Sequence, residues 1–285
     1  AEILRLWVAS ADYKTDIRIS NDILKQLAEV YRKIRNTFRF ILGNLDGFDP
    51  DSDRVAYGEL AEIDRWALMR LEQVRQKVTK AYDDYEFHLL YHTVHNFCTI
   101  DLSAIYLDIL KDRLYTELPA SRARRSAQTA LWELLQALVR IIAPVLTFTA
   151  EEVWQHCRAL DPRLPESVQM ALWPQASPEW HDDDLQARWE TLLAVREAVL
   201  VALEGLKARG ECDNPLEARV DIRAQAPLAA QLTALADQLA GLFVVSEVSV
   251  VQAEGLEDEF SVCVAKNTGE KCARCWMRLP SVGTQ

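Results

Sequence analysis

The sequence predicts a mainly α-helical protein that ends in a small mixed α/β subdomain. Long stretches repeat apolar residues at spacings of three and four, which is the period of a helix that buries one face. Only nine glycines and ten prolines occur among 285 residues, so few turn signals interrupt these stretches. From residue 217 onward the pattern changes to short alternating segments, which are typical of strands.

The expected helices follow one another from the N-terminus. Residues 1–9 have the pattern of a helix end, and a long amphipathic helix begins at Ser20 and ends near Asn44. Thr149 and Glu152 form a capping-box pattern, in which each side chain bonds a free backbone amide, so a shorter helix is expected to begin there. The other expected helices cover residues 59–82, 85–115, 121–142 and 184–208.

The chain is expected to divide into four parts, with the main boundary near Gly210. The segment 161–181 contains four prolines and is expected to be irregular. Beyond Gly210 the pattern predicts strands over 217–224, 243–251 and 260–265 and a helix over 228–239. The four expected parts are a remnant segment (1–19), a helical domain (20–209), a small α/β subdomain (210–265) and a tail (266–285).

Composition excludes several classes of protein. The net charge is −11, so any nucleic-acid contact must come from a local basic face on an acidic body. No apolar run approaches the ~18 residues of a membrane span. The six cysteines are mostly scattered, which favours a reducing cytoplasm over a disulfide framework. Because the sequence does not begin with Met and ends just past a Cys-x-x-Cys pair, we expect a piece of a larger protein.

One face of the predicted helix 20–44 is basic. On a helical wheel its members lie within one sector, away from the apolar set. The planar fork of arginine suits phosphate oxygens and base edges, and asparagine can read a base edge. A solvated face with internal ion pairs explains the same pattern, and the sequence leaves both interpretations open. The five residues are Lys25, Arg32, Arg35, Asn36 and Arg39.

A second basic cluster lies where one predicted helix ends and the next begins. Cations are favoured at a helix C-terminus by the helix dipole, so a structural role is the preferred interpretation. The cluster consists of Lys111, Arg113, Arg122, Arg124 and Arg125.

Three histidines, His88, His92 and His95, resemble a metal site because their spacings bring side chains together on a helix. The wheel separates them from an apolar face that contains Cys98. We therefore expect Cys98 in the core and the histidines on a flank or an interface, with a metal site as the less favoured interpretation.

No catalytic motif is present: the sequence lacks a GxxxxGK[ST] loop, a GxSxG elbow, an HExxH pair and a GxGxxG turn.

Cys272 and Cys275 form a Cys-x-x-Cys pair, which supplies two ligands of a tetrahedral zinc site. Cys263 is a nearby candidate for a third ligand. The pair alone predicts half of a zinc site.

Several segments together resemble the C-terminal half of bacterial isoleucyl-tRNA synthetases, which are class I aminoacyl-tRNA synthetases. Valyl- and leucyl-tRNA synthetases share the helical body, but the terminal GEKCARCW favours the isoleucyl family. The resemblance extends over essentially the whole chain. The matching segments are AEILRLWVASADYKTDIRIS, YRKIRNTFRFILGNL, DRWAL, FHLLYHTVHNFCTIDLSAIYLDILKDRLYTE, RRSAQTAL, APVLTFTAEEVW, NPLEARVDI and GEKCARCW.

The resemblance implies a class I anticodon-binding helix bundle followed by a C-terminal zinc module, of which only the first of two Cys-x-x-Cys pairs is present. The parent enzyme activates isoleucine with ATP and Mg and transfers it to its tRNA. This chain lacks the HIGH and KMSKS motifs, so it is expected to catalyse nothing, to hold no cofactor and to grip the anticodon stem-loop through the basic helix face.

The resemblance also implies a monomer in the cytoplasm that binds isoleucine tRNA and neither DNA nor a membrane. Two alternatives remain at this point. One is a valyl- or leucyl-type anticodon-binding domain, and the other is a non-catalytic helical scaffold or adaptor.

Overall fold

The structure, a computed structural model, describes residues 1–279 and 282, and the chain forms two compact units. The first unit is Ala1–Asp183, and the second begins at Asp184. Within the described residues, no helix combines the length and the apolar character that crossing a membrane requires.

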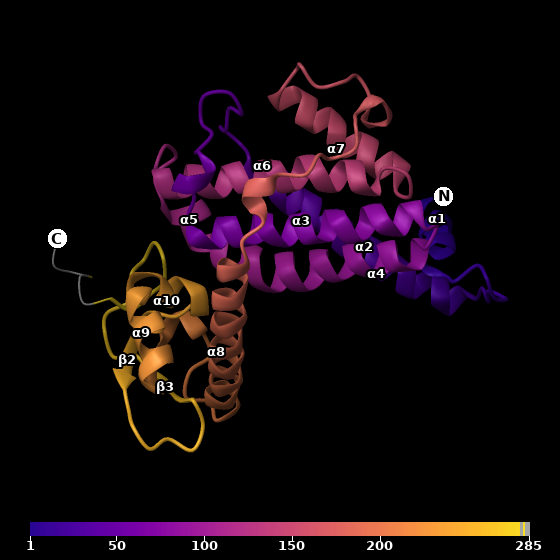
Figure 1. The fold of residues 1–285 in the computed structure, drawn as a ribbon. Coiled ribbons are helices and arrows are strands. Elements are labelled where there is room, and N and C mark those ends of the chain that lie inside the picture. Colours follow the sequence, from indigo (N-terminus) through magenta and orange to yellow (C-terminus); the bar gives the residue numbers. More distant parts are fainter. Residues whose placement is uncertain (280–281, 283–285) are drawn as a thin grey trace. The chain divides into compact units, whose positions relative to one another are not determined.

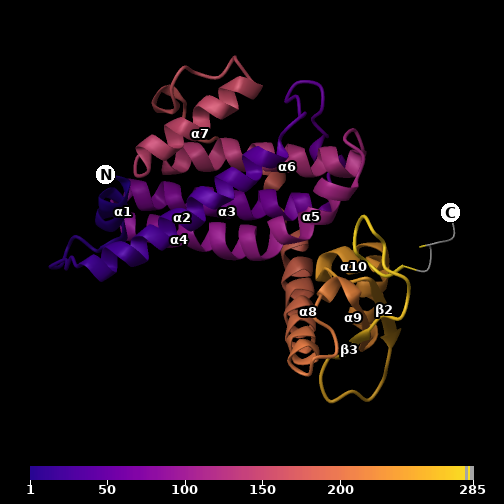
Figure 2. The same ribbon diagram turned by 180° about the vertical axis from the view of Figure 1, so that it is seen from behind.

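The first unit is a bundle of helices, as the sequence predicts. The helices α2, α3, α4 and α6 lie side by side, and α7 packs on α6 (Figures 1 and 2). Short 3₁₀ turns occur at Tyr57–Glu59 (η1), Val168–Met170 (η3) and Pro178–Trp180 (η4). The longer elements are α1 (Glu2–Ser10), α2 (Asn21–Asn44), α3 (Glu62–Asp83), α4 (Phe87–Asn96), the π-helix η2 (Phe97–Tyr106), α5 (Leu107–Thr116), α6 (Arg122–Ile142) and α7 (Thr147–Leu160).

The helix α2 confirms the pattern that predicted it. Ser20 is its N-cap, and the hydroxyl of Ser20 accepts a hydrogen bond from the backbone N–H of Ile23 at 3.2 Å. Its apolar residues are buried against the bundle, among them Leu27, Ile34, Phe38 and Ile41. The opposite face is therefore left to solvent.

The predicted helix 85–115 differs in its middle. It begins after Tyr85, which has a φ of 57°, and ten of its residues form the π-helix η2 between α4 and α5. The hydroxyl of Ser103 donates to the carbonyl of Cys98 at 2.7 Å inside this stretch. A π-helix bonds i to i+5, so it rotates side chains away from the 3.6-residue period on which the prediction rested.

The predicted capping box of Thr149 and Glu152 is wrong. The helix α7 begins at Thr147, two residues earlier, and the carboxylate of Glu2 accepts a hydrogen bond from the Thr149 backbone N–H at 2.9 Å. The Glu2 carboxylate also contacts the Thr149 hydroxyl, which lies 2.9 Å from the hydroxyl of Tyr31. A residue of α1 thus takes the role that the local pattern gave to Glu152.

A buried polar cluster connects α3, η2, α5 and α6. Asp64 is completely buried, and Tyr106 donates to its Oδ1 at 2.8 Å. Arg113 donates to both Asp64 oxygens at 2.7 and 3.0 Å, and the Ser126 hydroxyl donates to Oδ2 at 2.5 Å. The Asp64 charge is therefore paired and fully hydrogen-bonded, which is the condition for tolerating a buried carboxylate.

The second unit is a three-stranded sheet with helices. The strand order is β2-β1-β3, in which β1 runs parallel to β2 and antiparallel to β3. Along β1, Val220 and Ile222 are buried whereas Arg219 and Arg223 are exposed, so one face of the sheet is covered and the other is open. Its elements are α8 (Asp183–Ala208), the 3₁₀ turn η5 (Pro215–Glu217), β1 (Ala218–Ala224), α9 (Ala226–Ala234), α10 (Ala236–Phe243), β2 (Glu247–Gln252) and β3 (Phe260–Lys266).

Two features of this unit differ from the prediction. The division falls at Asp184 rather than near Gly210, because α8 belongs to the α/β unit: Arg196 of α8 is buried and donates to the Leu242 carbonyl of α10 at 3.1 Å. In addition, Phe243 ends a helix, and Val244 follows with a φ of 57°, so β2 begins only at Glu247.

Candidate functional site

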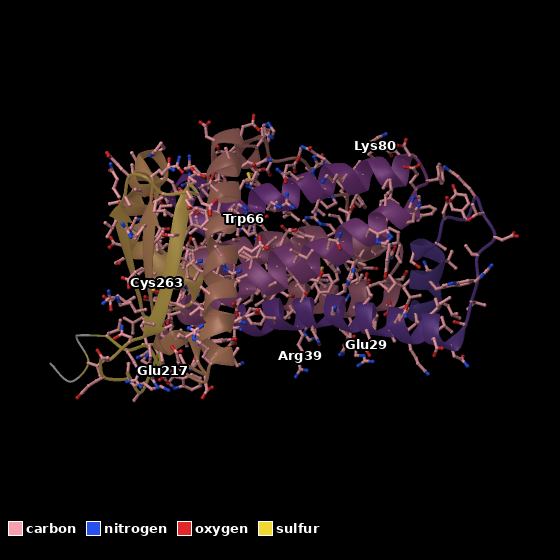
Figure 3. All side chains as sticks on the ribbon, turned by 90° about the horizontal axis from the view of Figure 1, so that it is seen from below. Glu29, Arg39, Trp66, Lys80, Glu217 and Cys263 are labelled. Carbon is pink, nitrogen blue, oxygen red and sulfur yellow. The ribbon has the colours of Figure 1, made fainter. Side chains whose placement is uncertain are left out.

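The five predicted site residues of α2 lie together on its outward face. Lys25, Arg32, Arg35, Asn36 and Arg39 are all exposed. Figure 3 shows Arg39 pointing away from the bundle. The apolar face of α2 is occupied by core contacts, so these side chains have no competing role in packing.

Acidic neighbours partly balance this face. The Nζ of Lys25 lies 3.3 Å from Asp22, Arg32 contacts Glu29, and Arg35 lies 4.0 Å from Glu152 of α7. Exposed ion pairs of this kind contribute about 0–1 kcal/mol and exchange readily for a ligand anion.

Arg39 and Asn36 differ from the other three members. Within the described part of the chain, neither side chain has an ion pair or a hydrogen bond. Arg39 therefore presents an unneutralised guanidinium and Asn36 an unused amide on the same face. This combination suits a ligand that offers both phosphates and base edges.

The second basic cluster serves the fold. Arg113 pairs with the buried Asp64. Arg125 pairs with Asp53 at 3.0 Å and donates to the carbonyl of Gly47 at 2.8 Å. Lys111 and Arg122 also have acidic partners, at 2.7 and 3.2 Å. The cluster is thus largely neutralised by its own neighbours.

The three histidines lie on α4 without forming a metal centre. No group of three metal-ligating side chains occurs within residues 1–279 and 282. Instead, the ring of Tyr91 is stacked on His95, with centroids 6.0 Å apart, and meets His92 edge-on at 4.9 Å. Cys98 is buried, as predicted, and burial raises the pKa of its thiol to about 12.

Cys272 and Cys275 lie in a small hairpin-like loop. The backbone N–H of Cys272 donates to the Met277 carbonyl at 2.8 Å, and Trp276 donates back to the Cys272 carbonyl at 3.0 Å. The backbone N–H groups of Cys275 and Arg274 lower the pKa of the Cys272 thiol. This favours the thiolate, which is the form that binds metal.

The residues present fit only half of a structural zinc site, which needs four ligands. Cys263 is exposed and paired in register with Asp221, on the open face of the sheet (Figure 3). It does not join the other two cysteines in a group of three ligands within the described residues. Cys263 is therefore not the third ligand that its position in the sequence made a candidate.

Glu217 holds this loop on the α/β unit. Its carboxylate oxygens lie 2.9 Å from the Nζ of Lys271 and 2.9 Å from a guanidinium nitrogen of Arg278. The hydrogen bonds from Lys271 and then from Arg278 lower the pKa of Glu217 to about 2. Arg278 also donates its backbone N–H to the Ser246 hydroxyl at 2.7 Å. Because Lys271 and Arg278 lie more than fifty residues from Glu217 in the sequence, no local pattern predicts these contacts.

We expect the chain to retain no stoichiometric zinc after purification without chelators. Two thiolates leave two coordination positions open, and metal affinity depends on a complete ligand set. Metal analysis of the purified protein measures this. One tightly held zinc per chain that disappears in Cys272→Ser, but not in Cys212→Ser, would contradict the expectation and reveal partners beyond this pair.

Comparison with known proteins identifies a protein family that part of the chain matches. Residues 64–222 match the family described as the anticodon-binding domain of tRNA ligase. Over 99% of its length, the chain is 48% identical to the isoleucine–tRNA ligase of Moorella thermoacetica and 50% identical to that of Desulfitobacterium hafniense. It spans 31% and 32% of these two proteins, which is about a third of their length.

A solved structure also shows some likeness. The ternary complex of Agrobacterium radiobacter K84 LeuRS with tRNA and LeuAMS has a TM-score of 0.46 and 14% identity. The alignment covers 90% of this chain and 28% of that one.

Proposed function

We propose that this chain, which belongs to the family of anticodon-binding domains of tRNA ligases, is the part of an isoleucine–tRNA ligase that grips the anticodon stem and loop. The reaction of the whole enzyme is the ATP-dependent joining of isoleucine to its tRNA. In that reaction this chain contributes binding and selection of the tRNA, and it takes no part in the bond-making step.

The observation that carries the proposal is the outward face of α2. It combines three arginines, a lysine and an asparagine on a protein whose net charge is −11. Phosphate contacts orient an RNA, and exposed arginine and asparagine side chains read unstacked bases in loops. The family match begins at residue 64, after α2, so the assignment of this face rests on its geometry.

Two further parts of the proposal concern its setting. All six cysteines carry free thiols in the structure, which suits a reducing cytoplasm. We also propose that the chain acts as a monomer, because a single α2 face holds the whole predicted set of contacts.

Fluorescence anisotropy over a salt series tests the proposal. We expect isoleucine tRNA to bind with an affinity that falls steeply with salt, by roughly 0.7–0.9 logarithmic units per logarithmic unit of salt for each phosphate contacted. Valine tRNA is expected to bind more weakly, and a valine tRNA that carries the isoleucine anticodon to recover the affinity.

The outcomes separate the alternatives. Equal affinity for all three RNAs would leave a tRNA-binding domain without isoleucine selectivity. If valine tRNA with its own anticodon binds more tightly than isoleucine tRNA, a valyl-type domain is favoured. Absence of a salt-dependent signal with any tRNA would support a helical scaffold and contradict the proposal.

A further inference from the structure

We infer that α4 carries a stacking site for an unpaired RNA base, formed by the ring of His92 and bordered by Leu89 and Asn96. The inference rests on the proposed function, because it extends the RNA-binding surface from α2 to α4. It assigns a role to His92, one of the three histidines of α4, which the α2 face leaves unexplained.

The three residues form one exposed stripe along α4. Leu89, His92 and Asn96 are spaced by three and four, so their side chains are neighbours on the helix surface. All three are exposed, and Leu89, an apolar residue, leaves 44% of its surface open to solvent. A flat ring, an apolar side chain and an amide in a row offer a base both a stacking surface and a hydrogen-bonding partner for its edge.

The ring of Tyr91 packs against the ring of His92. Tyr91 meets it edge-on, with ring centroids 4.9 Å apart and an interplanar angle of 72°. Tyr91 is itself stacked on His95 at an angle of 19°, and both rings are half-buried. Such bracing limits the rotamers of His92, so less conformational entropy is lost when a base stacks on it.

The stripe lies on a helix that packs beside α2, the helix of the basic face. The helices α2 and α4 pack beside each other, and Lys33 of α2 acts electrostatically on His95 of α4. Lys33 is exposed and lies one turn before Asn36, a member of the basic face. A single-stranded RNA whose phosphates contact Arg39 and Asn36 therefore meets a further cation, Lys33, before its next bases reach the ring of His92.

The chemistry of the cluster favours a base over an ion. The imidazole ring of His92 offers a flat stacking surface, and no group of three metal-ligating side chains lies beside it within the described residues. Proteins that bind single-stranded RNA commonly combine phosphate contacts with stacking of bases on aromatic rings, and anticodon loops expose unpaired bases.

Two substitutions at one position test the site. We expect His92→Ala to weaken binding of isoleucine tRNA roughly 5- to 100-fold, whereas His92→Phe keeps the affinity within about twofold because it retains a stacking ring. The matched control is His181→Ala, which removes an exposed histidine outside α4. The second readout is the fluorescence of isoleucine tRNAs that carry 2-aminopurine at each anticodon-loop position in turn, which stacking changes.

Each outcome decides between explanations. The stacking site is supported if His92→Ala loses affinity for isoleucine tRNA and His92→Phe retains it. The fluorescence of one 2-aminopurine position should then change in His92→Ala but not in His92→Phe. If His92→Ala binds like the unaltered chain and changes no 2-aminopurine signal, the stacking site is wrong while the α2 proposal stands. If His92→Phe loses as much affinity for isoleucine tRNA as His92→Ala does, the imidazole acts through a hydrogen bond and the stacking site is overturned. If the unaltered chain binds no tRNA, the proposed function fails and the stacking site with it.

Discussion

Replacing Asp64 by alanine is expected to lower the free energy of unfolding of the helical unit by about 3–5 kcal/mol. Asp64 is completely buried and accepts hydrogen bonds from Tyr106, Arg113 and Ser126, which belong to three other elements. Its removal leaves the Arg113 guanidinium without its counter-charge and two hydroxyl donors without their acceptor. A buried charge that loses its partner costs far more than an exposed ion pair is worth.

Urea unfolding followed by circular dichroism measures this effect. The control is Asp83→Ala at the other end of α3, where the aspartate is exposed at a helix C-terminus and its loss is expected to change stability by less than about 0.5 kcal/mol. Asp64→Asn keeps the shape and removes the charge, so it separates the charge from the packing. Equal midpoints for Asp64→Ala and Asp83→Ala would show that the buried cluster does not stabilise the fold.

Replacing Arg39 by alanine is expected to weaken binding of isoleucine tRNA by about 1–3 kcal/mol if this side chain reads a base edge. If it contacts a phosphate instead, the salt dependence should flatten by about one unit. Arg35→Ala is expected to act in the same direction but less strongly, since Arg35 already lies 4.0 Å from Glu152. Neither change should alter the helix content, because both side chains point away from the core.

A matched control lies on the opposite edge of the same unit. Lys80 is an exposed cation at the end of α3, and Figure 3 shows it on the far edge of the bundle from Arg39. Lys80→Ala removes the same charge without touching the α2 face, so a general electrostatic effect moves both variants equally. If Arg39→Ala and Lys80→Ala have the same affinity and the same salt slope, α2 is only a solvated face.

Much of the helical architecture was predictable because it is encoded locally. In α2, the cap at Ser20 and the apolar repeat from Leu27 to Ile41 place the basic residues outward without help from the rest of the molecule. The same holds for Cys98, whose burial follows from the apolar face that it shares. An amphipathic helix has one way to bury its apolar side, so its pattern also determines which residues face solvent.

The tertiary structure decided the features that depend on partners distant in sequence. Glu2 rather than Glu152 caps α7, because α1 brings a carboxylate to the free amides at the start of that helix. Glu217 anchors the Cys272–Cys275 loop through partners more than fifty residues away. Cys263 lies on the open face of the sheet and forms no group of three ligands with that pair within the described residues.

The same distinction explains the domain boundary and the histidines. The helix α8 resembles the preceding helices in its pattern, and its tertiary contacts, such as the one with α10, assign it to the second unit. The wheel placed the histidines on a flank, but the packing of Tyr91 against two of them arises from rotamers that no period encodes. The sequence by itself determined which faces are buried, because burial follows local periodicity. Only the tertiary structure decided which side chains meet, because such contacts depend on how distant elements pack.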